Sequence, residues 1–334
     1  MKMLSLTAFA VLAFFALSSC LSIKVDESTA FAPPKRALGP ANNVAELDAR
    51  KMAQFQPGID KGAYRLEPDG NGSFLLSRQN DTKNREAVMP PSILLRNGFI
   101  GEGGARIAWT SYSRPSPAAN GTVQQRPLVV HCAGNGGDRY NSGFNYAVKA
   151  LPWADVLVFD YPGYGDTPGP ASAASFEAAG SALTTHITAM AQDRKLVYWG
   201  HSLGSFVCSR LAALTPETDG LILETPAWNA AAVAKAWTPG FARAFVRPRV
   251  APSLASYDVV TASSQMNGPI LVLGAAKDNV LPVTLARQVA DGLKSNNANV
   301  IYQEFSQAQH MNIPDQPSFP ETIANFFRII ESTP

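Results

Sequence analysis

The pattern of hydrophobic and polar residues changes near Pro127, and from there onward two kinds of segment alternate. Short runs that are almost wholly apolar predict buried strands, and longer segments with apolar residues three or four positions apart predict amphipathic helices. The predicted strands cover residues 128–132, 156–160, 195–199, 221–224, 270–274 and 300–302. The predicted helices cover residues 140–151, 172–192, 205–214, 284–293 and 321–330. This alternation favours an α/β fold in which helices cover both faces of a parallel sheet.

The first part of the chain adds two predicted strands. Asp69-Gly70-Asn71-Gly72 is typical of a hairpin turn and leads into a strand at residues 73–76. Residues 105–112 predict another strand, residues 44–55 a short helix, and the polar stretch 113–126 a loop. We therefore expect a mostly parallel sheet of eight strands with an antiparallel leading edge.

The N-terminus has the pattern of a signal peptide over residues 1–19. Lys2 precedes an apolar run from Leu4 to Leu17 that is too short for a comfortable membrane span. Leu17-Ser18-Ser19-Cys20 resembles the lipobox of bacterial lipoproteins, which implies a mature chain anchored to the membrane by lipid on Cys20. An ordinary secretory signal with a chance cysteine is the alternative. We expect residues 20–60 to hold the lipidated cysteine and a tether and residues 61–334 to form the folded domain. The expected location is the bacterial cell envelope, on the periplasmic side of the outer membrane.

Composition excludes several classes of protein. The net charge is only +2, which gives no reason to expect a nucleic-acid partner. The four histidines lack metal-ligand spacing and no cysteine cluster accompanies them, so we predict neither a metal nor a cofactor. Cys132 and Cys208 lie in a predicted strand and a predicted helix. We expect two buried thiols there, with a disulfide as the alternative that an oxidising compartment allows. The oligomeric state stays open.

Gly200-His201-Ser202-Leu203-Gly204 stands between a predicted strand and a predicted helix. A serine on such a tight turn has a strained backbone, and glycines two residues before and after it relieve the crowding. Its hydroxyl is exposed above the sheet at the positive end of the helix dipole. We predict that Ser202 is a nucleophile, because the flanking strand and helix argue against a chance occurrence of the motif.

Three turns carry a resemblance to a known family. Gly134-Asn135-Gly136-Gly137, Asp160-Tyr161-Pro162-Gly163-Tyr164-Gly165 and Gly200-His201-Ser202-Leu203-Gly204 resemble the H-G-N-A-G, D-Y-R-G-Y-G and G-H-S-L-G motifs of one branch of the α/β-hydrolase superfamily. That branch contains the Bem46-like and ABHD12/13/17-like serine hydrolases, and the resemblance covers about residues 105–330. Ala133 and Pro162 replace the family's histidine and arginine, at positions that do no bond-making chemistry.

A serine nucleophile needs a neutral imidazole to take its proton and a carboxylate to orient that imidazole. In the α/β-hydrolase fold the chain order is serine, acid, histidine. Asp278 follows the strand 270–274 in a loop that resembles the family's G-x-x-D-x-x-x-P, and Glu224 is the alternative acid. His310 follows the last strand and is the only histidine after Asp278, so we predict it as the base. Of the other histidines, His131 is expected to pack in the core. His186 is expected to lie at the surface or in packing on a helix, and His201 to point away from the nucleophile.

The oxyanion of the reaction needs two preorganised N–H donors. The backbone N–H of Leu203 is one, because it follows the nucleophile. The resemblance assigns the backbone N–H of Asn135 as the second, with Gly134 or Gly136 as alternatives. It also implies hydrolysis of carboxylic esters, acyl thioesters or lysolipids through an acyl-enzyme. A serine peptidase acting on short peptides and a non-catalytic binding member of the fold are the alternatives.

Residues from about 226 to 266 interrupt the alternation and predict a small helical cap. Its aromatic residues either form an apolar acyl pocket or pack the cap onto the sheet: Trp228, Trp237, Phe241 and Phe245. Its arginines form either a solvated face or a site for phospholipid headgroups: Arg243, Arg247 and Arg249.

Overall fold

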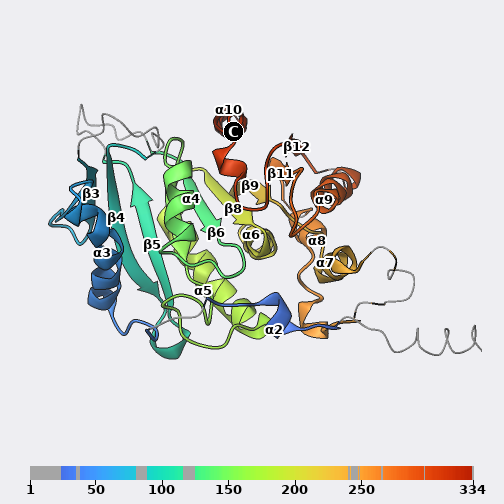
Figure 1. Cartoon of the computed structure of the whole chain (residues 1–334), viewed down its shortest axis with the longest axis horizontal. Helices are drawn as coiled ribbons and strands as arrows, with labels where there is room; N and C mark the ends of the chain where they lie inside the picture. The colour runs from blue at the N-terminus through green and yellow to red at the C-terminus, as the bar shows by residue number, and fades with distance from the viewer. Residues whose placement is uncertain are drawn as a thin grey trace, which may run out of the picture.

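The computed structural model describes residues 24–34, 38–79, 89–115, 125–239, 241, 247, 249–264, 266–296 and 298–332. Its strands are β1 (Lys24–Val25), β2 (Tyr64–Pro68), β3 (Phe74–Arg78), β4 (Ser92–Ile100), β5 (Ile107–Ser113), β6 (Leu128–Cys132), β7 (Asp155–Phe159), β8 (Leu196–His201), β9 (Thr218–Glu224), β10 (Arg249–Val250), β11 (Ile270–Ala275) and β12 (Val300–Phe305). Its α-helices are α2 (Glu27–Ala30), α3 (Val44–Asp60), α4 (Ser142–Ala150), α5 (Ala173–Ala191), α6 (Leu203–Ala213), α7 (Ala230–Trp237), α8 (Val259–Ser263), α9 (Thr284–Ser295) and α10 (Phe319–Ser332). Figure 1 shows these elements along the chain.

A central sheet organises the molecule. Its strand order is β12-β11-β9-β8-β6-β7-β5-β4-β3-β2. The six strands from β12 to β7 are parallel, and the β7–β5, β5–β4, β4–β3 and β3–β2 pairs are antiparallel. The parallel strands β6, β8 and β11 are buried along their whole length, which is why they read as apolar runs, whereas edge strand β12 is mostly half-buried. The predicted fold class is therefore confirmed.

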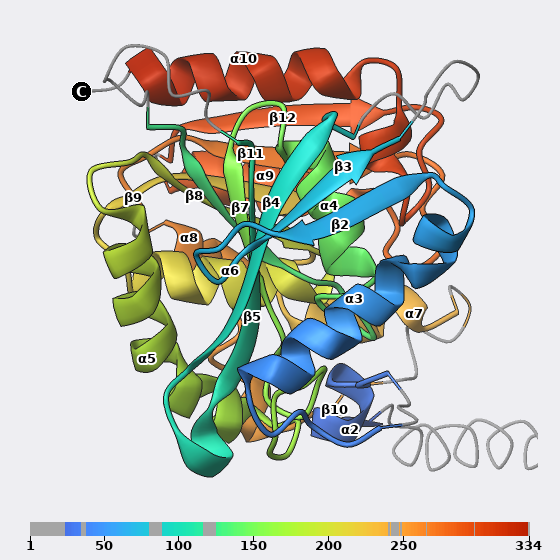
Figure 2. The ribbon, with the colours of Figure 1, turned by 90° about the vertical axis from the view of Figure 1, so that its left-hand side faces the viewer.

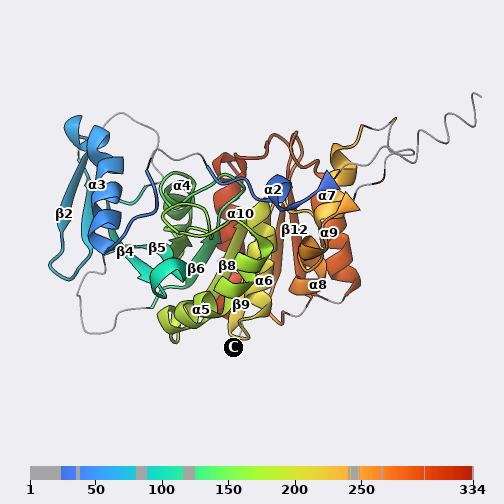
Figure 3. The same ribbon diagram turned by 90° about the horizontal axis from the view of Figure 1, so that it is seen from below.

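Helices cover both faces of the sheet. One hydrophobic cluster joins residues of α5, α6, α8 and α9 to one face, and a second joins residues of α3, α4 and α10 to the other. Figure 2 shows α3 running across the antiparallel strands, and Figure 3 shows the molecule from below. Because the two clusters lie on opposite sides of the parallel strands, the loops at the strand ends are held between two packed layers.

The sheet holds ten strands where we predicted eight. The two extra strands are β2 and β4, both in the antiparallel part. Edge strand β2 contains Arg65 and Glu67 and lacks a fully buried residue, so its pattern is weak. In β4, Arg96-Asn97-Gly98 interrupts the apolar alternation. Gly98 is required there because a Cβ atom would lie 2.4 Å from the indole ring of Trp109 on β5.

The segment predicted as a tether belongs in large part to the folded domain. Leu47, Lys51 and Phe55 of α3 are buried, and the amine of Lys51 donates a hydrogen bond of 3.1 Å to the backbone oxygen of Arg139. Burial lowers the pKa of Lys51 well below its usual value. The domain thus begins well before residue 61. Cys20 and the predicted signal peptide lie outside the described residues.

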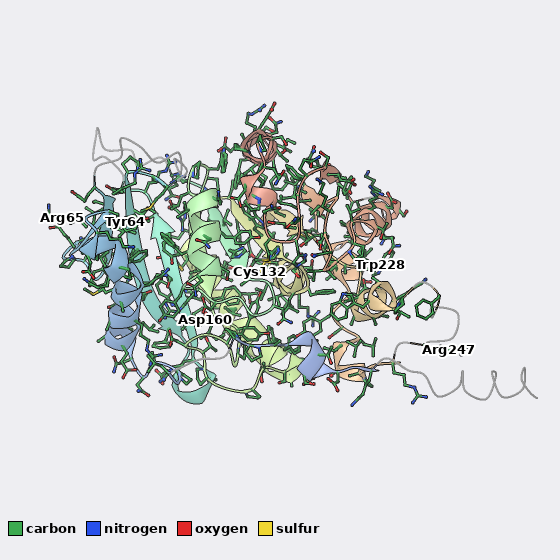
Figure 4. The ribbon with its side chains drawn as sticks, viewed as in Figure 1. Tyr64, Arg65, Cys132, Asp160, Trp228 and Arg247 are labelled. Carbon is green, nitrogen blue, oxygen red and sulfur yellow. A yellow bond between two sulfur atoms is a disulfide. The ribbon has the colours of Figure 1, made fainter. Side chains whose placement is uncertain are left out.

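Cys132 and Cys208 form a disulfide, so the expectation of two free thiols is wrong. Cys132 ends β6 and Cys208 lies in α6, with Cα atoms 5.9 Å apart. That separation falls within the range that a disulfide spans. Figure 4 labels Cys132 near the middle of the molecule. The bond joins the strand that precedes the glycine-rich turn to the helix that follows Ser202.

The described part of the predicted cap contains a strand as well as helices. It includes α7, α8 and β10, and β10 pairs in parallel with β1 from the start of the described chain. Arg243 and Phe245 lie outside the described residues. Among the described residues, no helix is long and apolar enough to cross a membrane.

Candidate active site

Ser202 lies on a sharp turn between β8 and α6. Its backbone has φ 54° and ψ −117°, a strained conformation for a residue with a side chain. A Cβ atom on Gly200 would lie 2.3 Å from the backbone oxygen of Gly204, and one on Gly204 would lie 1.9 Å from the backbone oxygen of Cys132. Only glycine fits at these two positions: the turn itself crowds position 200, and the end of β6 crowds position 204.

His310 contacts both of the other residues predicted for the site. Its Nε2 lies 3.0 Å from the hydroxyl oxygen of Ser202, and its Nδ1 lies 2.7 Å from Oδ2 of Asp278. Asp278 follows β11 and His310 follows β12, so both loops leave the carboxyl ends of neighbouring parallel strands. The structure thus brings together three side chains that the sequence separates by as many as 108 residues.

The carboxylate of Asp278 is held in place by its own loop. Its Oδ1 accepts backbone hydrogen bonds from Val280 and Leu281, both at 2.8 Å, while Oδ2 faces His310. A carboxylate that faces Nδ1 favours the tautomer that carries the proton there. Nε2 is then the nitrogen that can accept a proton from Ser202.

Glu224, the alternative acid, lies elsewhere. Its carboxyl oxygens are 3.0 Å from the hydroxyl of Tyr146 and 3.0 Å from the indole nitrogen of Trp199. The side chain is fully buried, and loss of hydration raises its pKa to about 8. Glu224 therefore belongs to a buried polar cluster, and Asp278 alone of the two faces His310.

His201 has a contact that the sequence analysis missed. Its Nε2 donates a hydrogen bond of 2.9 Å to the backbone oxygen of His310, which ties the nucleophile turn to the histidine loop. Burial lowers the pKa of His201 to about 4, so the ring is neutral at physiological pH. The side chain of His201 thus contacts the loop that carries His310.

The two other histidines pack as expected. His131 is buried, stacks on Tyr146 with ring centroids 4.2 Å apart, and has its pKa lowered to about 3 by burial. His186, in the middle of α5, lies with its ring centroid 5.4 Å from that of Trp109.

The glycine-rich turn after β6 faces Ser202 across a cavity. Residues 134–137 line this cavity together with Ser202, Leu203 and His310. Within the described part of the chain, the backbone N–H groups of Asn135 and Leu203 donate no hydrogen bond to protein. The side-chain oxygen of Asn135 accepts two hydrogen bonds of 2.8 Å, from the hydroxyl of Tyr164 and the backbone N–H of Ala32. The side chain of Asn135 thus holds the turn in place, and the backbone N–H groups of Asn135 and Leu203 have no protein acceptor among the described residues.

A buried ionic cluster supports this turn, and the sequence analysis missed it. Arg139 is fully buried and forms ion pairs with Asp160 and Asp166 from the loop after β7. Its backbone N–H also donates to Oδ1 of Asp160 at 2.8 Å. Figure 4 labels Asp160 below Cys132, in the interior. Two signals in the sequence could have revealed this cluster: two aspartates in one loop, and an arginine just after the glycine-rich turn.

The cavity has a volume of about 450 Å³ and is open to Ser202. Its apolar lining comes from the N-terminal segment, the cap and the loops that carry Asp278 and His310. The lining side chains include Val25, Phe31, Val233, Trp237, Leu254, Tyr257, Leu281 and Met311. Such a volume and lining are typical of sites for small apolar ligands.

Of the aromatic residues in the cap, one lines the cavity and another packs the cap onto the rest of the domain. Trp237 lines the cavity, and its indole nitrogen donates to the backbone oxygen of Val280 at 2.8 Å. Trp228 instead packs against Gly292 of α9 and donates to Asp258 at 3.0 Å (Figure 4). Phe241 is 85% exposed.

Two arginines of the predicted cap cluster, Arg247 and Arg249, are exposed. Figure 4 shows Arg247 at the margin of the molecule.

Among the described residues, no group of three or more histidine, cysteine, aspartate or glutamate side chains is arranged to hold a metal ion.

The chain is similar to known hydrolases in sequence and in structure. Residues 127–258 match the family described as "alpha/beta hydrolase fold". The lysophosphatidylserine lipase ABHD12 of Danio rerio is 28% identical over 227 residues, which are 60% of this chain and 58% of that protein. ABHD12 of Xenopus tropicalis is 30% identical over 179 residues, 49% of this chain and 46% of that protein. The chain thus spans about half the length of these curated relatives.

A solved structure supports the same fold. The carboxylesterase Cest-2923 of Lactobacillus plantarum superposes with a TM-score of 0.51 at 14% identity, over 70% of this chain and 96% of that one. At this identity the match concerns the fold alone. The strand order, the nucleophile turn and the relatives agree with the predicted resemblance: the chain has an α/β-hydrolase fold and is similar in sequence to the ABHD12 lipases.

Proposed function

We propose that the chain is a serine hydrolase that cleaves carboxylic esters or acyl thioesters through an acyl-enzyme on Ser202. The observation that carries this proposal is the hydrogen-bonded row from Ser202 through His310 to Asp278, at 3.0 and 2.7 Å. The row opens onto an apolar cavity of about 450 Å³. Nucleophile, base and orienting acid are thus within reach of one another beside a site that fits an acyl group.

The proposed reaction uses these residues in two half-reactions. The oxygen of Ser202 attacks the substrate carbonyl while Nε2 of His310 takes the hydroxyl proton. The imidazolium, stabilised by Asp278, then gives that proton to the departing alcohol or thiol, which leaves an ester on Ser202. Water repeats the sequence: His310 takes a proton from it, the hydroxyl adds to the acyl carbon, and the proton returns to Ser202. The N–H groups of Asn135 and Leu203 stabilise the two oxyanions.

Two observations support an ester with an apolar acyl chain as the substrate. The walls of the cavity are mainly apolar, and relatives of the chain carry the name lysophosphatidylserine lipase. In the proposed complex the acyl chain lies between the N-terminal segment and α7, and the polar leaving group lies toward Asn141 and Ser142, which also line the cavity.

The test is a panel of matched esters, thioesters and short peptides with acyl groups from short to long. Ser202→Ala is the blank for each substrate, and a fluorophosphonate probe reports whether Ser202 is reactive. We expect labelling and turnover of esters or thioesters that both disappear in Ser202→Ala. Cleavage of peptides alone would favour the peptidase alternative. Absence of both labelling and turnover would favour a non-catalytic binding protein.

We further propose that the chain is a bacterial envelope lipoprotein anchored through lipid on Cys20. The lipobox-like Leu17-Ser18-Ser19-Cys20 supports this proposal. The intact mass of the mature chain tests it, because lipid-modified and plain N-termini differ by the mass of the attached acyl chains. A mature N-terminus that lacks lipid would contradict it.

A further inference from the structure

Residues 24–34, here called the N-terminal strap, lie against the cap and the glycine-rich turn. Figures 1 and 2 show α2, within the strap, beside β10 of the cap. Val25 of β1 pairs with Val250 of β10, and the backbone oxygen of Val25 accepts a hydrogen bond of 2.9 Å from Ala251. Segments more than 200 residues apart in the sequence are thereby joined at one side of the cavity.

The main anchor of the strap is Phe31, which is only 3% exposed. Its ring stacks on Phe176 of α5 with centroids 4.7 Å apart and meets the ring of Tyr257 edge-on at 6.1 Å. Buried aromatic contacts of this kind restrict the backbone on either side of the ring. The next residue, Ala32, is therefore held in a defined position.

Ala32 contacts the turn that carries the proposed oxyanion donor. Its backbone N–H donates a hydrogen bond of 2.8 Å to the side-chain oxygen of Asn135. The hydroxyl of Tyr164 donates the second, also at 2.8 Å, so both lone pairs of that oxygen are used. Two independent elements thus fix the Asn135 side chain. Asn135 also lines the cavity beside Ser202, and within the described part of the chain its backbone N–H donates no hydrogen bond to protein.

The strap also forms one wall of the cavity. Five of its residues line the same space as Ser202 and His310: Val25, Thr29, Ala30, Phe31 and Pro34. A substrate in this cavity would touch the strap directly. The seating of Phe31 therefore affects both the shape of the acyl site and the placement of Asn135.

We propose that the N-terminal strap is a positioning element of the hydrolase, which holds Asn135 through Ala32 and closes one wall of the acyl site. This inference rests on the proposed function. It predicts that unseating the strap lowers the rate of the chemical step, because the second oxyanion donor loses its fixed position.

The test is a double-mutant cycle in the full-length protein with Phe31→Ala and Asn135→Ala. The second change removes the side-chain oxygen that accepts from Ala32 and leaves the backbone N–H of residue 135 in place. We expect Phe31→Ala to lower kcat at least about tenfold with a smaller change in KM, since displaced oxyanion donors act in the transition state. The double variant should lose less than the product of the single effects, because both changes break the same link. Phe31→Leu should recover part of the rate.

Phe74→Ala is the matched control for lost aromatic packing, because Phe74 is a partly buried ring on β3, far along the sheet. We expect it to lower the melting temperature and leave kcat unchanged. The proposal is overturned if Phe31→Ala affects only the melting temperature, as Phe74→Ala does, or if its effect multiplies fully with that of Asn135→Ala. Absence of Ser202-dependent turnover in the unaltered protein would overturn the proposed function itself, so the two failures are told apart.

Discussion

Replacing both Cys132 and Cys208 with alanine is the sharpest test of the disulfide. The bond joins β6, which leads into the glycine-rich turn, to α6, which begins directly after Ser202. Removing it leaves the backbone path of the sheet unchanged but frees the unfolded chain from a covalent loop. The expected effect is therefore a loss of stability that arises mainly in the unfolded state.

The size of the loss follows from the length of the loop. The two cysteines are 76 residues apart, and the loop-entropy relation gives about 4.5 kcal/mol at room temperature for a loop of that length. For a domain of roughly 300 residues this corresponds to a fall in melting temperature of about 7 °C. The two buried alanines leave small voids that add to the loss.

Thermal and denaturant unfolding measure this effect. The three samples to compare are the oxidised protein, the same protein with reductant present, and the double alanine variant. We expect the reduced protein and the variant to unfold at similar, lower midpoints, and the variant to be insensitive to reductant. Alkylation followed by mass spectrometry counts the free thiols independently. If the unaltered protein has the same midpoint with and without reductant, and both thiols are alkylated after unfolding without it, the disulfide and the reasoning built on it are refuted.

Three further predictions concern the site and its support. Asp278→Asn should lower kcat by about 10⁴-fold, because the amide no longer favours the tautomer of His310 that accepts a proton. Steady-state kinetics measure this, and a kcat within tenfold of the original would contradict it. Glu224→Gln should flatten the pH dependence of stability. Burial raises the pKa of Glu224 in the folded state to about 8, against the usual 4.5, so between these pH values the folded protein keeps a proton that the unfolded chain loses. The free energy of unfolding therefore falls as pH rises from about 4.5 to 8, by up to ~5 kcal/mol. Melting curves at mildly acidic and mildly alkaline pH test this, and parallel curves for the two proteins would contradict it. Gly204→Ala should abolish folded protein or cost several kcal/mol, since its Cβ would lie 1.9 Å from the backbone oxygen of Cys132; an unchanged melting temperature would show that the turn can relax.

Local patterns in the sequence were enough to predict most of the architecture and the candidate nucleophile. The inner parallel strands are buried on both faces, so each reads as an apolar run, and the helices between them show their own periodicity. The turn at Ser202 needs glycine at position 200 because of crowding within the motif itself, and at position 204 because the backbone of Cys132 lies against it. Chain order then identified Asp278 and His310, since the fold places the ends of successive parallel strands at one edge.

Other features depend on which distant segments meet, and only the tertiary structure decided them. Glu224 ends β9 and Asp278 follows β11, yet one faces the buried hydroxyl of Tyr146 and the other faces His310. The disulfide depends on a distance across 76 residues, which no local pattern encodes.

The N-terminal segment shows the same limit most clearly. Its composition is that of a linker, and nothing in residues 24–34 indicates that Phe31 enters an aromatic cluster or that Ala32 contacts Asn135, 103 residues away. By itself, the sequence determined the parallel part of the sheet, the main helices and the candidate nucleophile Ser202, because each follows mainly from the preferences of neighbouring residues. The tertiary structure decided the partners of each polar group and the walls of the cavity, because these depend on side chains brought together by folding.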